Sequence, residues 1–146
     1  MSTDEKVTKD VVQTLEDGKE GFASAAEKLA DSDTPEVAAT FRGFSQQRSE
    51  FAAELRQLAG AYGDDAAESS SVAGAVHRGW MSIKDALTGS DPKGVIKAAE
   101  QGEHHAVQEY EKALEQDISA GLKVVLERQL VDVRSAYATV QSLTNS

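Results

Sequence analysis

The sequence predicts an all-α protein: a four-helix bundle of two antiparallel hairpins, with an additional helical crossover between the second and third helices. Proline occurs only twice, which leaves room for long uninterrupted helices. Apolar residues recur at spacings of three and four over four long segments, the pattern of helices with one buried face. The 146 residues suit one domain, which we assign to 1–146.

The first predicted helix covers 4–30. Its buried stripe consists of Val11, Leu15, Gly18, Phe22, Ala25 and Leu29. Acidic residues occupy the opposite side, where we expect solvent: Glu16, Glu20 and Glu27. Residues 31–33 then form a turn, so the next helix should run antiparallel to the first.

The second predicted helix covers 35–62 and begins at the start signal Thr34-Pro35-Glu36. Its inner stripe is rich in aromatic residues, namely Phe41, Phe44, Phe51, Leu55 and Tyr62. Arg48 lies near the centre of this stripe, whereas Glu50 and Glu54 are expected to point aside or outward. A cation among phenylalanines needs a buried partner.

Residues 71–88 form the predicted crossover helix, with an apolar stripe of Val72, Val76, Trp80, Ile83 and Leu87. Trp80 is expected to anchor this helix on the bundle, with His77 to one side. The alternative is a ligand-binding groove beside the crossover, in which His77 and Trp80 would be the contact residues.

The third predicted helix covers 92–116, capped by Asp91 and opened by Pro92. Its stripe is Val95, Ala99, Gly102, Ala106, Tyr110 and Ala113. At about 100° per residue, Glu103 falls within roughly 40° of the centre of this stripe. A carboxylate facing a helix interface costs several kcal/mol unless it is paired.

The last predicted helix covers 118–143, with Asp117 as its cap. Its stripe is Leu122, Val125, Gln129, Val133, Ala136 and Val140, in which Gln129 is the polar exception. Counting residues from the two hairpin turns puts Arg48 and Glu103 at mid-height, with Gln129 within about one helical turn of them. We therefore predict a buried polar cluster of these three residues, in which Arg48 and Glu103 pair.

The chain resembles a bacterial family of ferritin-like four-helix bundles that is designated a domain of unknown function. The residues that carry the resemblance are Asp17-Gly18 with Gly21-Phe22, His77-Arg78-Gly79-Trp80, Glu100 with Gly102-Glu103 and Tyr110, and Gln129. The resemblance implies a ferritin-like fold and a bacterial source, and it brings no activity with it.

Di-iron bundles place Glu on two helices and Glu-x-x-His on two others. No histidine here has a Glu three positions earlier, and none follows His105. We therefore expect no metal, no other cofactor and no catalytic residues. If a metal does bind, Glu100, Glu103 and His104 are the fallback ligands, because they share a helix face. An internal Arg48 in the place of a metal could be the remnant of a lost site; the simpler reading is that the cluster only fixes helix register.

The net charge of -10 opposes binding to nucleic acid or anionic membranes. There is no cysteine, no signal-like N-terminus and no apolar run of the roughly 20 residues that span a bilayer, so we expect a soluble, cytoplasmic protein without membrane insertion.

The preferred function is a non-catalytic ferritin-like bundle that associates with itself or with another protein. The alternative is an iron- or manganese-binding, stress-related protein with a degenerate carboxylate site, and a third hypothesis is a small-molecule binding module at the crossover groove.

Overall fold

The computed structural model describes residues 3–30, 34–61 and 91–145, which form an all-α bundle of four helices. These are α1 (Thr3–Ala30), α2 (Pro35–Ala61), α4 (Pro92–Leu114) and α5 (Ala120–Thr144). The four long helices predicted from the apolar periodicity are confirmed, with ends that differ from the prediction by at most two residues. The predicted crossover helix at 71–88 lies outside the described residues.

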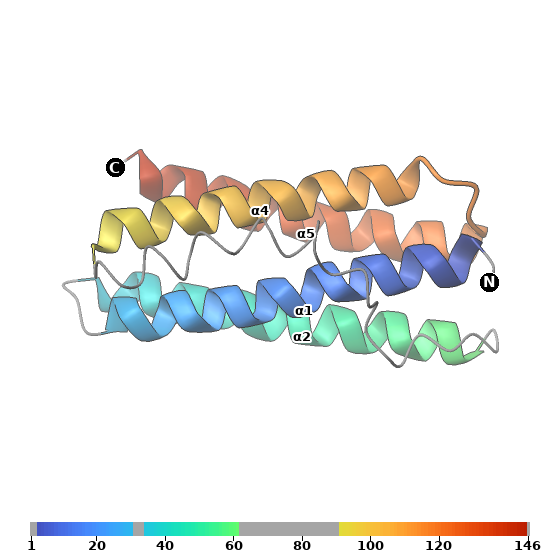
Figure 1. Cartoon of the computed structure of the whole chain (residues 1–146), viewed down its shortest axis with the longest axis horizontal. Helices are drawn as coiled ribbons and strands as arrows, with labels where there is room; N and C mark the ends of the chain where they lie inside the picture. The colour runs from blue at the N-terminus through green and yellow to red at the C-terminus, as the bar shows by residue number, and fades with distance from the viewer. Residues whose placement is uncertain (1–2, 31–33, 62–90, 146) are drawn as a thin grey trace.

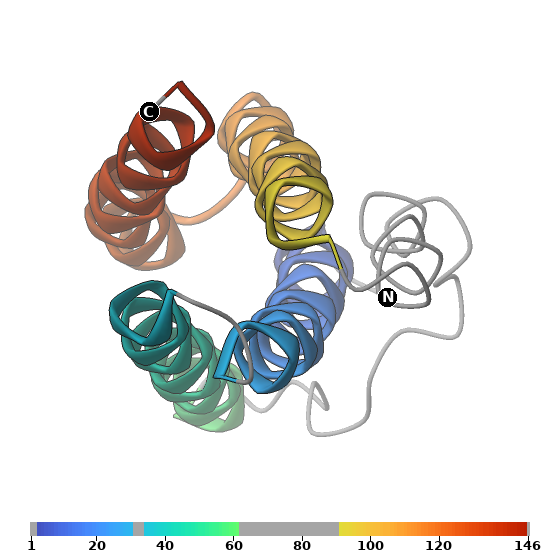
Figure 2. The same cartoon turned by 90° about the vertical axis from the view of Figure 1, so that its left-hand side faces the viewer.

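The helices stand at the four corners of the bundle, and the sequential pairs α1–α2 and α4–α5 are antiparallel (Figures 1 and 2). α2 ends and α4 begins at opposite ends of the bundle (Figure 1). Packing is most extensive between α1 and α2, and weakest along the side where α2 meets α5. α2 and α4 therefore occupy diagonally opposite corners (Figure 2).

The start of α4 follows the prediction, whereas the start of α5 corrects it. Asp91 caps α4 by accepting a hydrogen bond from the Lys93 backbone N–H at 3.2 Å. α5 is capped by Ser119, whose hydroxyl accepts from the Leu122 N–H at 3.4 Å. The predicted cap at Asp117 is wrong because the chain stays non-helical through residue 119, so the first free N–H groups of α5 face Ser119.

The outer face of α1 is less uniform than its sequence predicts. Glu20 and Glu27 are exposed. Glu16 is half-buried and forms ion pairs with Lys19 and with Arg56 of α2. Burial would raise the pKa of Glu16, but these two cations outweigh it and lower the pKa. None of the described helices is long and apolar enough to cross a membrane.

The core has two hydrophobic clusters, one toward each end of the bundle. One cluster joins the N-terminal half of α1 to the C-terminal halves of α2 and α4 and to most of α5. The other joins the C-terminal half of α1 to the N-terminal halves of α2 and α4 and to the end of α5. Arg48 and Glu103 lie between the two clusters along α2 and α4, so a buried charged layer separates them.

Candidate functional site

The most unusual feature of the interior is an ion pair across the diagonal of the bundle. Arg48 of α2 and Glu103 of α4 are 1% and 0% exposed. Arg48 Nη1 donates to Glu103 Oε1 at 2.5 Å, and Nη2 donates to Oε2. The planar guanidinium therefore meets both carboxylate oxygens through two parallel bonds, the strongest geometry for this pair.

Apolar residues surround the Arg48 side chain. A methyl group at Gly18 would lie 3.5 Å from Arg48 Cγ and 3.6 Å from Nη1, which are ordinary van der Waals distances, so the Arg48 side chain passes close beside α1 at this point. The Arg48 guanidinium lies 5.4 Å from the centre of the Phe22 ring, a cation–π distance. Phe22 packs edge-on against Phe41 and Phe44. Water is thus excluded on the aromatic side of the pair.

The charge state of the pair follows from these contacts. Burial alone would lower the pKa of Arg48, but attraction and hydrogen bonding to Glu103 outweigh it and raise the pKa. The third guanidinium nitrogen, Nε, donates to the Gln47 side chain at 3.2 Å. Arg48 is therefore a permanent cation whose strongest bonds are directed at Glu103.

A second set of polar side chains lies beside the hydrophobic cluster that includes the N-terminal half of α1. Gln129 of α5 is fully buried, and its Oε1 accepts from the Tyr110 hydroxyl at 2.7 Å. Its Nε2 donates to Glu54 Oε1 at 2.9 Å and to the Phe51 carbonyl at 3.3 Å. Glu54 also pairs with Arg128 at the surface. The result is a hydrogen-bonded chain that joins α4, α5 and α2 and ends in solvent.

Within the described helices, Gln129 makes no direct bond to Arg48 or Glu103. Its partners Tyr110 and Glu54 lie about 10 Å further along α4 and α2 than the ion pair. Gln129 was expected within about one helical turn of the ion pair, but it lies further away because residues 115–119 carry the chain past the end of α4 before α5 starts (Figure 1). Gln129 is therefore displaced along the bundle relative to a simple count from the turn.

The pKa values of Tyr110 and Glu54 in this second group are shifted in opposite directions. Burial raises the pKa of Tyr110 far above its ordinary value of 10, and although the Arg48 cation opposes this, Glu103 and Glu54 add to it. For Glu54, burial would raise the pKa, but hydrogen bonds from Gln129 and Arg128 and the charge of Arg128 lower it. Tyr110 is therefore a neutral donor at ordinary pH, and Glu54 is a carboxylate.

The residues present do not fit a ferritin-type metal centre. Glu103 already directs both oxygens at a cation, while the proposed fallback ligands beside it are dispersed: Glu100 is half-buried and His104 is exposed, stacking on Tyr137 with ring centres 5.5 Å apart. Across residues 3–30, 34–61 and 91–145, no group of three or more His, Asp or Glu side chains could hold a metal ion. The candidate groove residues His77 and Trp80 lie outside the described residues.

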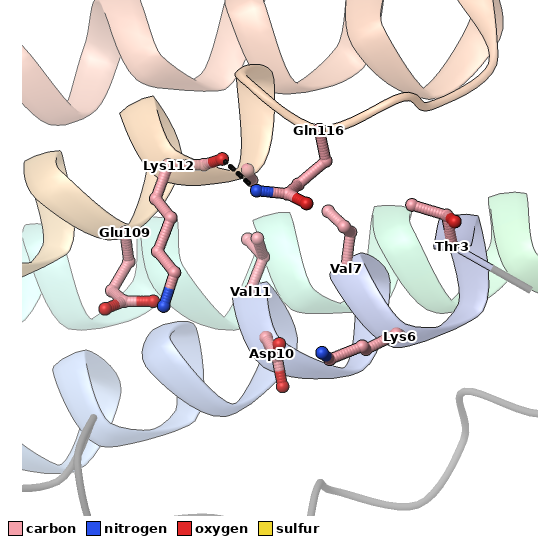
Figure 3. Close-up of a pocket in the computed structure, with 9 residues that line it drawn as sticks. Thr3, Lys6, Val7, Asp10, Val11, Glu109, Lys112 and Gln116 are labelled. Atoms are coloured by element: carbon pink, nitrogen blue, oxygen red, sulfur yellow. Dashed lines mark hydrogen bonds between the residues drawn. The ribbon is translucent and has the colours of Figure 1, made fainter. Parts of the chain in front are cut away.

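A surface pocket of about 290 Å³ lies between the start of α1 and the end of α4 (Figure 3). Val7, Val11 and Ala113 line it together with two lysines, Lys6 and Lys112, and two acids, Asp10 and Glu109; Thr3 and Gln116 complete the lining. The two cations and two anions balance, so the pocket has no charge preference. Neither Arg48 nor Glu103 lines this pocket.

Two residues of the interior hydrogen-bond network were not predicted from the sequence. Tyr110 is assigned there to the apolar stripe, and Glu54 is expected to point aside or outward, whereas both bond to Gln129. The correction for Glu54 has a physical cause: α2 and α5 pack loosely, so a long acidic side chain can turn back into the space between them. A buried Gln opposite a Tyr was the available signal for the network, since an interior amide needs partners.

A family model described as a domain of unknown function, DUF2383, matches residues 5–116. The chain belongs to this family. The DUF2383 match includes Gly18, Arg48, Glu103 and Tyr110, and it ends before α5, so Gln129 lies beyond it. No curated protein gives a significant match.

Proposed function

We propose that this DUF2383 protein is a ferritin-like bundle that carries an internal ion pair in place of a central metal site and acts non-catalytically, by association with protein. The ferritin-like assignment is supported by the order of helices: two antiparallel hairpins, with α2 ending and α4 beginning at opposite ends. Two antiparallel hairpins arranged in this way are typical of ferritin-like bundles.

The observation that carries the proposal is the bidentate Arg48–Glu103 pair. A divalent metal at 4 Å from the guanidinium would be repelled by about 8 kcal/mol at an effective dielectric constant near 20. Glu103, the buried carboxylate of α4, is occupied by Arg48 and is not available as a bridging ligand. The interior therefore favours a fixed structure over metal chemistry.

The remaining interior polar groups support the same proposal. Tyr110 and Gln129 satisfy one another, and Glu54 receives hydrogen bonds from Gln129 and Arg128. General acid or base catalysis requires a group that can reach a substrate and change its protonation state. Tyr110 fails on both counts, which leaves the outer helix faces as the functional surfaces of the described bundle.

The test is metal content and metal uptake. Protein purified without chelator is analysed for all transition metals, then dialysed against Mn²⁺ or anaerobic Fe²⁺ and passed through gel filtration. We expect far less than one metal per chain before and after dialysis. One or more retained iron or manganese ions per chain, lost in a Glu103→Gln variant, would overturn the proposal in favour of a degenerate carboxylate site.

A further inference from the structure

The two most exposed large apolar side chains of the described helices lie on one face of α5. Val124 and Val131 are each 65% exposed. Their spacing of seven residues is two helical turns, so they lie within about 20° of each other around the axis. Ala138, one further step of seven, is also exposed and continues the stripe. This stripe is opposite the buried side of α5, which contains Leu122, Val133 and Val140.

We propose that the outer face of α5 binds a second copy of the same face, antiparallel, about a twofold axis at Val131. This inference rests on the proposed function and names the partner. A spacing of seven supplies one of the two apolar positions per heptad at the seam of a two-helix interface, and charged residues flank it here. Antiparallel helices align their dipoles favourably, and a self-complementary patch generates a closed dimer.

The charges beside the stripe complement one another in this arrangement. Glu127 and Arg134 lie on the side toward α4, where Arg134 pairs with Glu111. In an antiparallel pair centred on Val131, each flank meets the same flank of the other copy. Glu127 then meets the second copy's Arg134 with an offset of one residue, about 1.5 Å along the axis.

The opposite flank gives a second complementary pair. Arg128 lies toward α2, where it pairs with Glu54, and Asp132 lies on the same side of α5. In the antiparallel dimer Arg128 meets the second copy's Asp132 with an offset of two residues, about 3 Å. Twofold symmetry repeats each of these contacts, so four ion pairs flank the apolar stripe.

The overall charge balance also selects this face. The chain carries a net charge of -10. α5 carries three cations, Lys123, Arg128 and Arg134, against two anions, Glu127 and Asp132. Two copies therefore meet with the least repulsion along α5. A single helix face about 37 Å long is a small interface, so we expect a reversible dimer in the micromolar range.

Sedimentation velocity over roughly 1 to 500 μM protein tests the dimer, a range that spans micromolar dissociation constants. The wild-type chain should shift from monomer to dimer as concentration rises. Val131→Glu places two carboxylates at the twofold axis and should keep the chain monomeric throughout. Ala53→Glu adds the same charge at an exposed position of α2 and should dimerise like the wild type.

Charge reversal tests the orientation. Glu127→Arg opposes Arg134 of the second copy and should weaken the dimer at least tenfold. The double variant Glu127→Arg/Arg134→Glu recreates the pair with its polarity reversed and should restore dimerisation. Weakening without restoration in the double variant would overturn the antiparallel arrangement.

Two results overturn the α5 interface itself. One is a wild-type chain that stays monomeric up to the highest concentration. The other is a Val131→Glu variant that dimerises like the wild type but unfolds at a lower temperature. That result would mean that Val131 packs within its own chain and not against a second copy. Neither result bears on metal binding, so failure of this inference and failure of the proposed function are separately visible.

Discussion

Arg48 and Glu54 lie on the same helix, about 9 Å apart along its axis, and both reach across the bundle to a polar partner. Arg48 meets Glu103 in a fully buried site, whereas Glu54 meets Gln129 and Arg128 at a site whose acid side chain is 35% exposed. The first contact cannot be replaced by water and the second can. The comparison teaches that burial, more than the number of bonds, decides how much each contact matters for folding.

The largest effect is expected at the buried contact. Glu103→Ala leaves the Arg48 cation without its carboxylate in a dry interior, which should cost about 3 to 5 kcal/mol of unfolding free energy. The melting temperature should fall by roughly 10 °C or more. Glu100→Ala, on the half-buried edge of the same helix, is the matched control and should change stability by about 0.5 kcal/mol or less. Equal small losses in both variants would contradict the importance of the pair.

An intermediate effect is expected at the neutral part of the second contact. Gln129→Leu leaves the buried Tyr110 hydroxyl without its acceptor, which should cost about 1 to 3 kcal/mol in chemical denaturation. Gln108→Leu, at an exposed position of α4, is the control for the change in side-chain type. A Gln129→Leu variant as stable as the control would show that the network contributes nothing to folding.

A smaller effect is expected where α5 begins. Ser119→Ala removes the hydroxyl that accepts from the Leu122 N–H and should cost about 1 kcal/mol. Asp117→Ala should leave the thermal melt almost unchanged, because its side chain is exposed before the helix starts. A larger loss of stability in Asp117→Ala than in Ser119→Ala would show that Asp117 is the cap of α5.

The smallest effect is expected at the exposed end of the second contact, and it depends on pH. The folded pKa of Glu54 is lowered, so the folded state binds this proton less readily than the unfolded chain. Its contribution is present above about pH 4.5 and is lost as the pH falls through the folded pKa. Because the Glu54 and Arg128 side chains are 35% and 57% exposed, solvent screens the pair and we expect less than about 1 kcal/mol.

Denaturation at pH 6 and at pH 3.5 should therefore show a slightly smaller loss of stability for Glu54→Gln than for the wild type. The glutamine keeps the size and an acceptor for Gln129 while it removes the titrating group. An identical pH dependence in the two proteins would mean that Arg128 and Gln129 do not perturb Glu54.

Much of the fold could be predicted from the sequence because each helix has a buried stripe and clear end signals. Pro35, Asp91 and Pro92 mark helix starts through local chemistry alone. The start of α5 could not be predicted in this way, since both Asp117 and Ser119 are good caps and only the course of residues 115–119 decides between them.

The interior polar contacts also differ in whether the sequence could predict them. Counting from the turns brings Arg48 and Glu103 to one level, and their two side chains meet in the structure. The same count misplaces Gln129, because it depends on the length of an extended connection rather than on helix geometry. Glu54 was missed because its direction depends on how loosely α2 and α5 pack.

The most direct test of the central claim is a double-mutant cycle on the buried pair. Arg48→Met and Glu103→Leu should each cost about 3 to 5 kcal/mol of unfolding free energy, because each leaves one charge unpaired in the interior. The double variant removes both charges and should recover most of that loss. Losses that add to within about 0.5 kcal/mol would contradict the claim that Arg48 and Glu103 hold one another inside the bundle.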